Sequence, residues 1–147
     1  MAAKNILVVP TDFSERSLTA LAWVRQRAEA MQADIRCIYV VEEPQIYSTL
    51  DMGPVAIPSV TELVKSAEEH LDSFIKANIK AFGSAPKASV LVGRPAEEIV
   101  SYARDNDATM IVMTTHGYSG VKHLLLGSTT EGVLRHASCP VLSIRTA

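Results

Sequence analysis

Five short apolar runs alternate with stretches of helical periodicity, and this alternation constrains the fold more than any other feature of the sequence. The runs cover residues 6–10, 35–41, 88–92, 110–114 and 140–144. The first and fourth are almost continuous in Ile, Val, Leu and Met, which is typical of strands that are covered on both faces. The last begins with Pro140 and alternates apolar with polar residues, so we expect an edge strand.

Four helices are predicted between the runs. The first covers about 14–32, and its apolar face consists of Leu18, Leu21, Ala22, Ala28 and Met31. The second covers about 60–82, and Gly83 follows it at a position that glycine favours beyond a helix end. Its apolar face consists of Val60, Leu63, Val64, Ala67, Leu71, Phe74, Ile75 and Phe82.

The other two helices have start signals. Pro95 suits a first helical position, and Glu97 and Glu98 follow in the first turn. Ser128 and Glu131 have the spacing of a capping box at the start of the last helix. Because strands and helices alternate throughout, we predict one α/β domain over residues 1–147, an open parallel sheet with helices on both faces.

Charge and hydropathy exclude several classes of protein. The net charge is −2 and the isoelectric point is about 6.1, whereas nucleic-acid-binding domains usually carry a basic face. No stretch approaches the roughly 20 apolar residues of a membrane span. The apolar run near the N-terminus is too short for a signal peptide. We therefore expect a cytoplasmic protein that binds neither nucleic acid nor membrane.

Two strand ends carry the residues that best suit a ligand site. In open α/β sheets, ligands bind beyond the carboxyl ends of the strands, where the winding reverses. Residues 10–12 end the first strand, and a glycine-containing loop after Met113 leads to Gly127 and Ser128. Glycine allows close backbone approach and a helix start attracts anions, so Gly127 and Ser128 form either a phosphate cradle or only a turn and a cap.

The region 111–145 resembles the nucleotide-binding branch of the universal stress protein family. The signature of that branch is Gly, two residues, Gly, nine residues, Gly and Ser or Thr. Gly117, nine further residues and Gly127-Ser128 match its second part. The likeness extends to the Val-Pro-Thr-Asp-Phe-Ser start, the Gly-Arg-Pro turn after the third run and the His-Ala-Ser-Cys-Pro-Val-Leu end. Thr114 stands where the signature has its first glycine, and its side chain either adds a hydroxyl to the site or crowds it.

The resemblance implies a Rossmann-like, adenine nucleotide α-hydrolase-like fold with strand order 3-2-1-4-5, which binds ATP with Mg²⁺. The implied residues at the adenine end are Pro10, Thr11, Asp12 and the backbone of Val40 or Val41. Those at the ribose and α-phosphate are Met113, Thr114, His116 and Gly117. Those at the distal phosphates are Gly127, Ser128 and Thr129. For Asp12 the alternative is a helix cap formed together with Glu15.

Motifs of rapid catalysis are absent from the sequence. It has no P-loop with its lysine and no G-x-S-x-G nucleophile elbow, and its histidines lack the spacing of metal ligands. A receiver domain would need an acidic residue after the third strand, where this chain has Gly-Arg. His116 and His123 flank the candidate phosphate site, whereas His70 and His136 are expected on helix surfaces. We expect at most slow ATP hydrolysis.

Cys37 and Cys139 are expected to be buried, reduced thiols. In the implied order their strands are three positions apart, roughly 14 Å at about 4.8 Å per strand, whereas a disulfide needs Cα atoms within about 7 Å. A bond between two chains through Cys139 is the alternative.

The last strand and one long connection are expected to meet partners. An unpaired strand edge invites association, and the resemblance implies a homodimer through Val141, Leu142, Ser143 and Ile144. Segment 42–59 contains three prolines and several apolar residues, so we expect it to pack on another surface, such as a partner subunit. The alternative is a flexible insertion.

Two functional hypotheses from different classes follow. The first is an ATP-binding stress-response sensor or adaptor. The second is a dimeric interaction module whose pocket is disabled by Thr114 and which binds unknown protein partners through 42–59. A small hydrolase is a third and weaker hypothesis, because no nucleophile–base pair is visible.

Overall fold

The computed structural model describes residues 3–43, 58–115 and 126–145. Its strands are β1 (Asn5–Pro10), β2 (Ala33–Val41), β3 (Lys87–Val92), β4 (Met110–Thr114) and β5 (Val141–Ile144). They form one parallel sheet in the order β3-β2-β1-β4-β5, as predicted. The winding reverses between β1 and β4, so the carboxyl ends of these two strands lie side by side.

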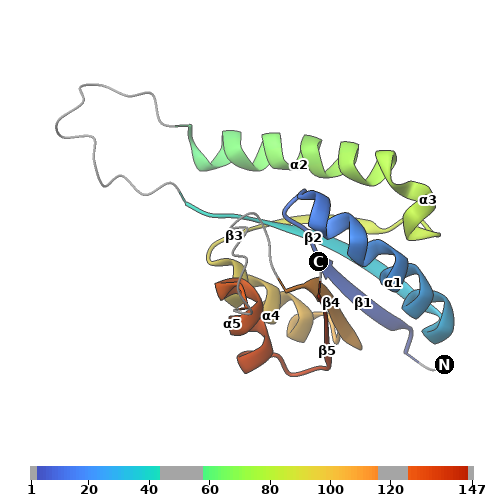
Figure 1. The fold of residues 1–147 in the computed structure, drawn as a ribbon. Coiled ribbons are helices and arrows are strands. Elements are labelled where there is room, and N and C mark those ends of the chain that lie inside the picture. Colours follow the sequence, from blue (N-terminus) through green and yellow to red (C-terminus); the bar gives the residue numbers. More distant parts are fainter. Residues whose placement is uncertain (1–2, 44–57, 116–125, 146–147) are drawn as a thin grey trace, which may run out of the picture.

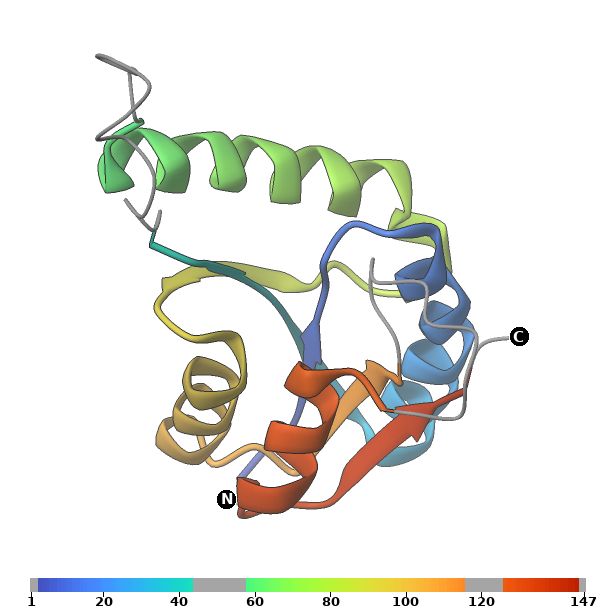
Figure 2. The ribbon, with the colours of Figure 1, turned by 60° about the vertical axis from the view of Figure 1, so that its left-hand side comes forward.

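Helices cover both faces of the sheet (Figures 1 and 2). They are α1 (Glu15–Met31), α2 (Val60–Ala77), α3 (Ile79–Phe82), α4 (Pro95–Asp105) and α5 (Ser128–His136). The first three pack on one face, whereas α4 and α5 pack together on the other. No helix in the described ranges is both long and apolar enough to cross a membrane.

The two central strands divide their side chains between two cores. On β1, Leu7 and Val9 join the core beneath α1 to α3, whereas Val8 joins the core beneath α4 and α5. On β4, Val112 joins the core beneath α1 to α3, whereas Ile111 joins the core beneath α4 and α5. All five are buried, which confirms that both strands are covered on both faces.

The predicted apolar face of α1 is wrong in part. Leu18 is 39% exposed and Ala22 is also exposed. The buried face consists of Ser17, Ala20, Leu21, Val24 and Ala28. Ser17 can be buried because its hydroxyl donates a hydrogen bond of 2.6 Å to the Ser14 carbonyl. Ser17 and Ala20 therefore complete the buried face in place of Leu18 and Ala22.

The predicted second helix is interrupted at Asn78, which separates α2 from α3. The Asn78 side-chain amide donates to the Phe74 carbonyl at 2.8 Å and so competes with the helical backbone pattern. Phe82 is nevertheless buried and Gly83 ends α3 with φ of 80°, as its position predicted. Val60, which was assigned to the apolar face, is exposed.

Candidate functional site

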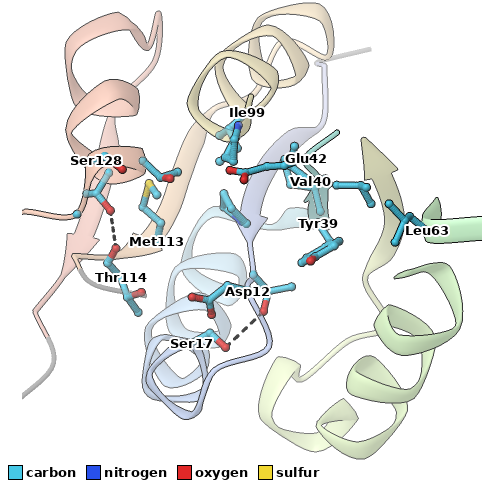
Figure 3. A pocket seen from close by; sticks show the side chains of 18 residues that line it. Asp12, Ser17, Tyr39, Val40, Glu42, Leu63, Ile99, Met113, Thr114 and Ser128 are labelled. Carbon is cyan, nitrogen blue, oxygen red and sulfur yellow. Dashed lines mark hydrogen bonds between the residues drawn. The ribbon is translucent and has the colours of Figure 1, made fainter. Parts of the chain in front are cut away.

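A cavity of about 640 Å³ lies at the carboxyl ends of β1, β2 and β4 (Figure 3). Every predicted site residue that the structure describes lines it: Pro10, Thr11, Asp12, Val40, Val41, Met113, Thr114, Gly127, Ser128 and Thr129. His116 and Gly117 lie outside the described residues, as do His123 and most of segment 42–59. The volume falls within the roughly 300–1,000 Å³ of typical small-molecule sites.

The turn between β1 and α1 presents Asp12 to the cavity. The Thr11 amide donates to the Ile38 carbonyl at 2.9 Å, which ties the turn to β2. Asp12 Oδ1 accepts from the Ser14 amide at 2.9 Å, and Ser14, not Asp12, is the N-cap of α1. The alternative role of Asp12 as a cap with Glu15 is therefore wrong. Its carboxylate lines the cavity and can accept a hydrogen bond from a ligand.

The start of α5 is anchored to the end of β4 at two points. The Gly127 amide donates to the Thr115 carbonyl at 2.9 Å. The Thr130 hydroxyl, buried with its residue 3% exposed, donates to the Thr114 carbonyl at 2.8 Å. A Cβ on Gly127 would lie only 3.3 Å from the Thr115 oxygen, so glycine permits this close approach.

The predicted capping box of α5 is wrong. Gly127 is the N-cap, so Ser128 occupies the first helical position, and no side chain caps the helix. Glu131 instead forms an ion pair of 2.9 Å with Arg135, one turn further along. The first N–H groups of a helix have no partner within it. Those of Ser128 and Thr129 border the cavity and suit an anion.

Charge differs between the two ends of the cavity. The lining carboxylates belong to Asp12 and Glu42, which follow β1 and β2. Figure 3 shows Ser128 on the other side of the cavity, at the start of α5. The start of α4, at Pro95, also lacks a side-chain cap, and its first turn carries two acidic residues, Glu97 and Glu98. The first turn of α5 carries one, Glu131, which is paired with Arg135. An anionic group is therefore stabilised best at α5, where the helix dipole attracts it.

Several lining residues were not predicted for the site. They are Ser17, Ile38, Tyr39, Glu42, Leu63, Pro95, Ile99 and Thr130. Leu63 counted as part of an apolar helix face and Pro95 only as a helix start, because periodicity does not say which residues of a face reach a cavity. Thr130 could have been predicted as a site residue, because it is a hydroxyl residue in the first turn of the helix that follows the glycine motif.

The described residues offer no site for a resident metal ion. Among residues 3–43, 58–115 and 126–145, no group of three or more His, Cys, Asp or Glu side chains could hold one. The cavity bears hydroxyl groups at its α5 end, from Ser128, Thr129 and Thr130. A divalent cation there would take most of its ligands from phosphate oxygens and water, which is common for Mg²⁺.

Comparisons with known proteins agree on one family. The sequence model of the universal stress protein family matches residues 4–145. Universal stress protein MJ0531 of Methanocaldococcus jannaschii is 33% identical over 139 residues, covering 95% of this chain and 81% of that protein. The solved structure of universal stress protein UspA from Lactobacillus plantarum is 28% identical and has a TM-score of 0.76. The match covers 99% of this chain and 100% of that chain.

Two more distant structures share the fold and hold nucleotides. A universal stress protein in complex with cAMP has a TM-score of 0.70 at 23% identity, and the match covers 99% of this chain and 100% of that chain. The Archaeoglobus fulgidus protein in complex with dAMP has a TM-score of 0.64 at 23% identity, covering 98% and 99%.

Proposed function

The chain belongs to the universal stress protein family, and we propose that it is a nucleotide-binding member that holds ATP and acts as a stress-response sensor or adaptor. The observation that carries the proposal is the cavity itself. It has the volume of a small-molecule site, with an uncapped helix start at one end and the Asp12 carboxylate at the other. Two structures with the same fold are complexes with cAMP and dAMP, which supports nucleotide binding without specifying ATP.

The charge distribution favours one orientation of the nucleotide. Phosphates belong at the α5 start, where Ser128 and Thr129 can donate backbone N–H groups and hydroxyl groups. The adenine belongs near Asp12, because a carboxylate accepts from an exocyclic amine but repels phosphate. Val40, Leu63 and Ile99 line the cavity and supply apolar contacts for a base or a ribose.

Mg²⁺ is proposed to enter with ATP and not to reside in the protein. It would neutralise the phosphates at α5, with hydroxyl groups of Ser128 or Thr129 as possible protein contacts. The two carboxylates among the described lining residues are Asp12, which follows β1, and Glu42, which follows β2, whereas the phosphates are proposed to lie at α5, which follows β4. Because neither of these described carboxylates follows β4, we expect binding and, at most, slow hydrolysis.

Released nucleotide and calorimetry test the proposal. The purified protein is denatured, and the supernatant is analysed by absorbance and chromatography. Protein stripped of nucleotide is then titrated with Mg-ATP. We expect either a stoichiometric adenine nucleotide or saturable binding of one ATP per chain. If neither is seen at millimolar Mg-ATP, nucleotide binding is contradicted.

Thr114 favours a second candidate, the interaction module with a disabled pocket. It lines the cavity where the family signature has glycine. If its branched side chain blocks the nucleotide, Thr114→Gly will bind Mg-ATP although the unaltered chain does not. If both chains bind Mg-ATP, this second candidate is excluded.

We also propose that two copies pair through β5. This strand is the last in the sheet order. The carbonyls of Pro140, directly before β5, and of Ile144, its last residue, accept from the Ile111 and Thr115 amides at 3.0 Å. Because backbone polar groups alternate along a strand, those of Val141 and Ser143 point to the opposite side. They are the groups available to a second β5.

A further inference from the structure

Three aromatic rings form a column beside the cavity. The Phe13 and Tyr39 ring centroids are 4.6 Å apart with an interplanar angle of 23°. The Phe13 and His70 centroids are 4.1 Å apart with an angle of 18°. Two rings at such separations cannot occupy the same face of a third, so Phe13 lies between Tyr39 and His70. Phe74 adds an edge contact at 5.6 Å.

The backbone of Phe13 is in an unfavourable conformation. Its φ is 64°, in the left-handed region that glycine adopts readily and a residue with a Cβ does not. Such conformations persist where the surroundings determine them, and they cluster at functional sites. Here the ring column holds the side chain, and the Phe13 amide donates to Thr11 Oγ1 at 3.1 Å.

The column connects three elements at the cavity. Phe13 directly follows Asp12 in the turn after β1, Tyr39 belongs to β2 and lines the cavity, and His70 belongs to α2. His70 was expected to be a solvated surface residue. It is exposed, yet its ring covers the outer face of Phe13.

We propose that Phe13 and His70 are positioning residues that fix the turn presenting Asp12, an inference that rests on the proposed nucleotide function. The His70 ring closes the column from the solvent side, so the strained Phe13 cannot relax. Asp12 then keeps the orientation in which Oδ1 accepts from the Ser14 amide and the carboxylate faces the cavity. Neither ring needs to touch the nucleotide.

Binding of two partial ligands tests the inference. Adenosine probes the Asp12 end, and inorganic tripolyphosphate probes the α5 end. We expect His70→Ala to weaken adenosine binding about fivefold or more, within the usual range of coupling between sites, and to leave tripolyphosphate unchanged. His70→Phe keeps a stacking ring and should restore adenosine binding. His136→Ala, which removes an exposed histidine from the last turn of α5, is the matched control and should bind adenosine normally.

Phe13→Gly separates positioning from backbone strain. Glycine adopts the same φ without strain but carries no ring, so the variant should fold and still lose adenosine affinity. Adenosine binding equal to that of the unaltered protein in both Phe13→Gly and His70→Ala would overturn the inference. Equal losses for adenosine and tripolyphosphate would also overturn it, because they would indicate a general disturbance.

Hydrogen exchange of the ligand-free protein gives a test that does not depend on nucleotide binding. The Ser14 amide reports the Asp12 turn, and the Gly127 amide, bonded to the Thr115 carbonyl, is the reference. We expect faster exchange at Ser14 alone in His70→Ala, with recovery in His70→Phe. Unchanged Ser14 exchange would contradict positioning, whereas altered exchange without any nucleotide binding would contradict only the proposed function.

Discussion

Cys37 shows at the scale of one residue how the fold controls reactivity. Its side chain on β2 is 0% exposed in the core beneath α1 to α3. Burial disfavours the thiolate and raises the pKa of Cys37 from 9.0 to about 12. Burial also raises the pKa of the partly exposed Cys139. The two thiols are not bonded to each other, and Cys37 is buried as predicted, whereas the prediction that Cys139 is buried is wrong, because it is partly exposed.

The raised pKa of Cys37 makes stability depend on alkaline pH. The folded chain holds the thiol proton more tightly than the unfolded chain does. The protonated Cys37 thiol therefore contributes its full share to the free energy of unfolding below pH 9. This contribution is lost as pH rises toward 12, by at most about 1.4 kcal/mol per pH unit. We expect Cys37→Ala to be less stable by roughly 1 kcal/mol at neutral pH, with this deficit shrinking above pH 9. Urea unfolding at several pH values measures it, and a deficit that stays constant to pH 11 would be the contrary result.

Which residue caps a helix was the hardest feature to predict. At α1 and α5 the chain offers neighbouring candidates, Asp12 and Ser14 in one case and Gly127 and Ser128 in the other. Motif spacing did not distinguish them, because the choice depends on where each backbone first becomes helical. In both cases a tertiary hydrogen bond holds the chain near that point, from Thr11 to the Ile38 carbonyl and from Gly127 to the Thr115 carbonyl.

At the scale of elements, α4 and α5 approach each other closely at Gly132. A Cβ on Gly132 would lie 2.7 Å from the Ala96 Cβ, which is too close for either helix to stay in place. Both helices begin at the cavity, where Pro95 and Ser128 line it. Their contact therefore contributes to the position of the anion-binding end.

Gly132→Ala should destabilise the protein although alanine favours helices. Overpacking costs about 1–3 kcal/mol, against a gain in helix propensity of about 1 kcal/mol. The difference is a net loss of up to about 2 kcal/mol, which urea unfolding measures. Ala96→Gly removes the opposing Cβ, so adding it to Gly132→Ala should recover part of the loss. A Gly132→Ala variant more stable than the unaltered chain would show that the helices separate without cost.

Strands were predicted more accurately than helix faces. Each apolar run became one strand, and the two almost continuous runs became β1 and β4, which are buried on both faces. Helix faces depend on details that periodicity does not contain. Ser17 is buried with its hydroxyl bonded to the Ser14 carbonyl, whereas its neighbour Leu18 is exposed. The second helix is interrupted at Asn78, whose side chain bonds to the Phe74 carbonyl.

At the scale of the whole molecule, winding order creates the site. Two segments far apart in sequence, the turn after β1 and the start of α5, meet because β1 and β4 are neighbours. The strand order implied by the family resemblance predicted that meeting, and the general rule for open α/β sheets placed the ligand there. It did not predict the α2 and β2 residues, such as Leu63 and Tyr39, that complete the cavity wall.

The proposed homodimer makes a prediction about the edge of the sheet. Ser143→Pro removes an amide that points away from β4, so the fold should tolerate it while pairing between two β5 strands is lost. Analytical ultracentrifugation should show a dimer for the unaltered chain and a monomer for this variant. Ser143→Ala keeps the amide and should remain dimeric. A dimeric Ser143→Pro variant would place the interface elsewhere.

The most direct test of the nucleotide site is an amide chemical-shift titration of the ¹⁵N-labelled protein with Mg-ATP. The account predicts saturable shifts that are largest at Ser128 and Thr129 and at the turn that includes Asp12. Adenosine alone should shift the turn, and tripolyphosphate alone should shift the α5 start. Saturable shifts that avoid both places, or no shifts at millimolar Mg-ATP, would contradict it.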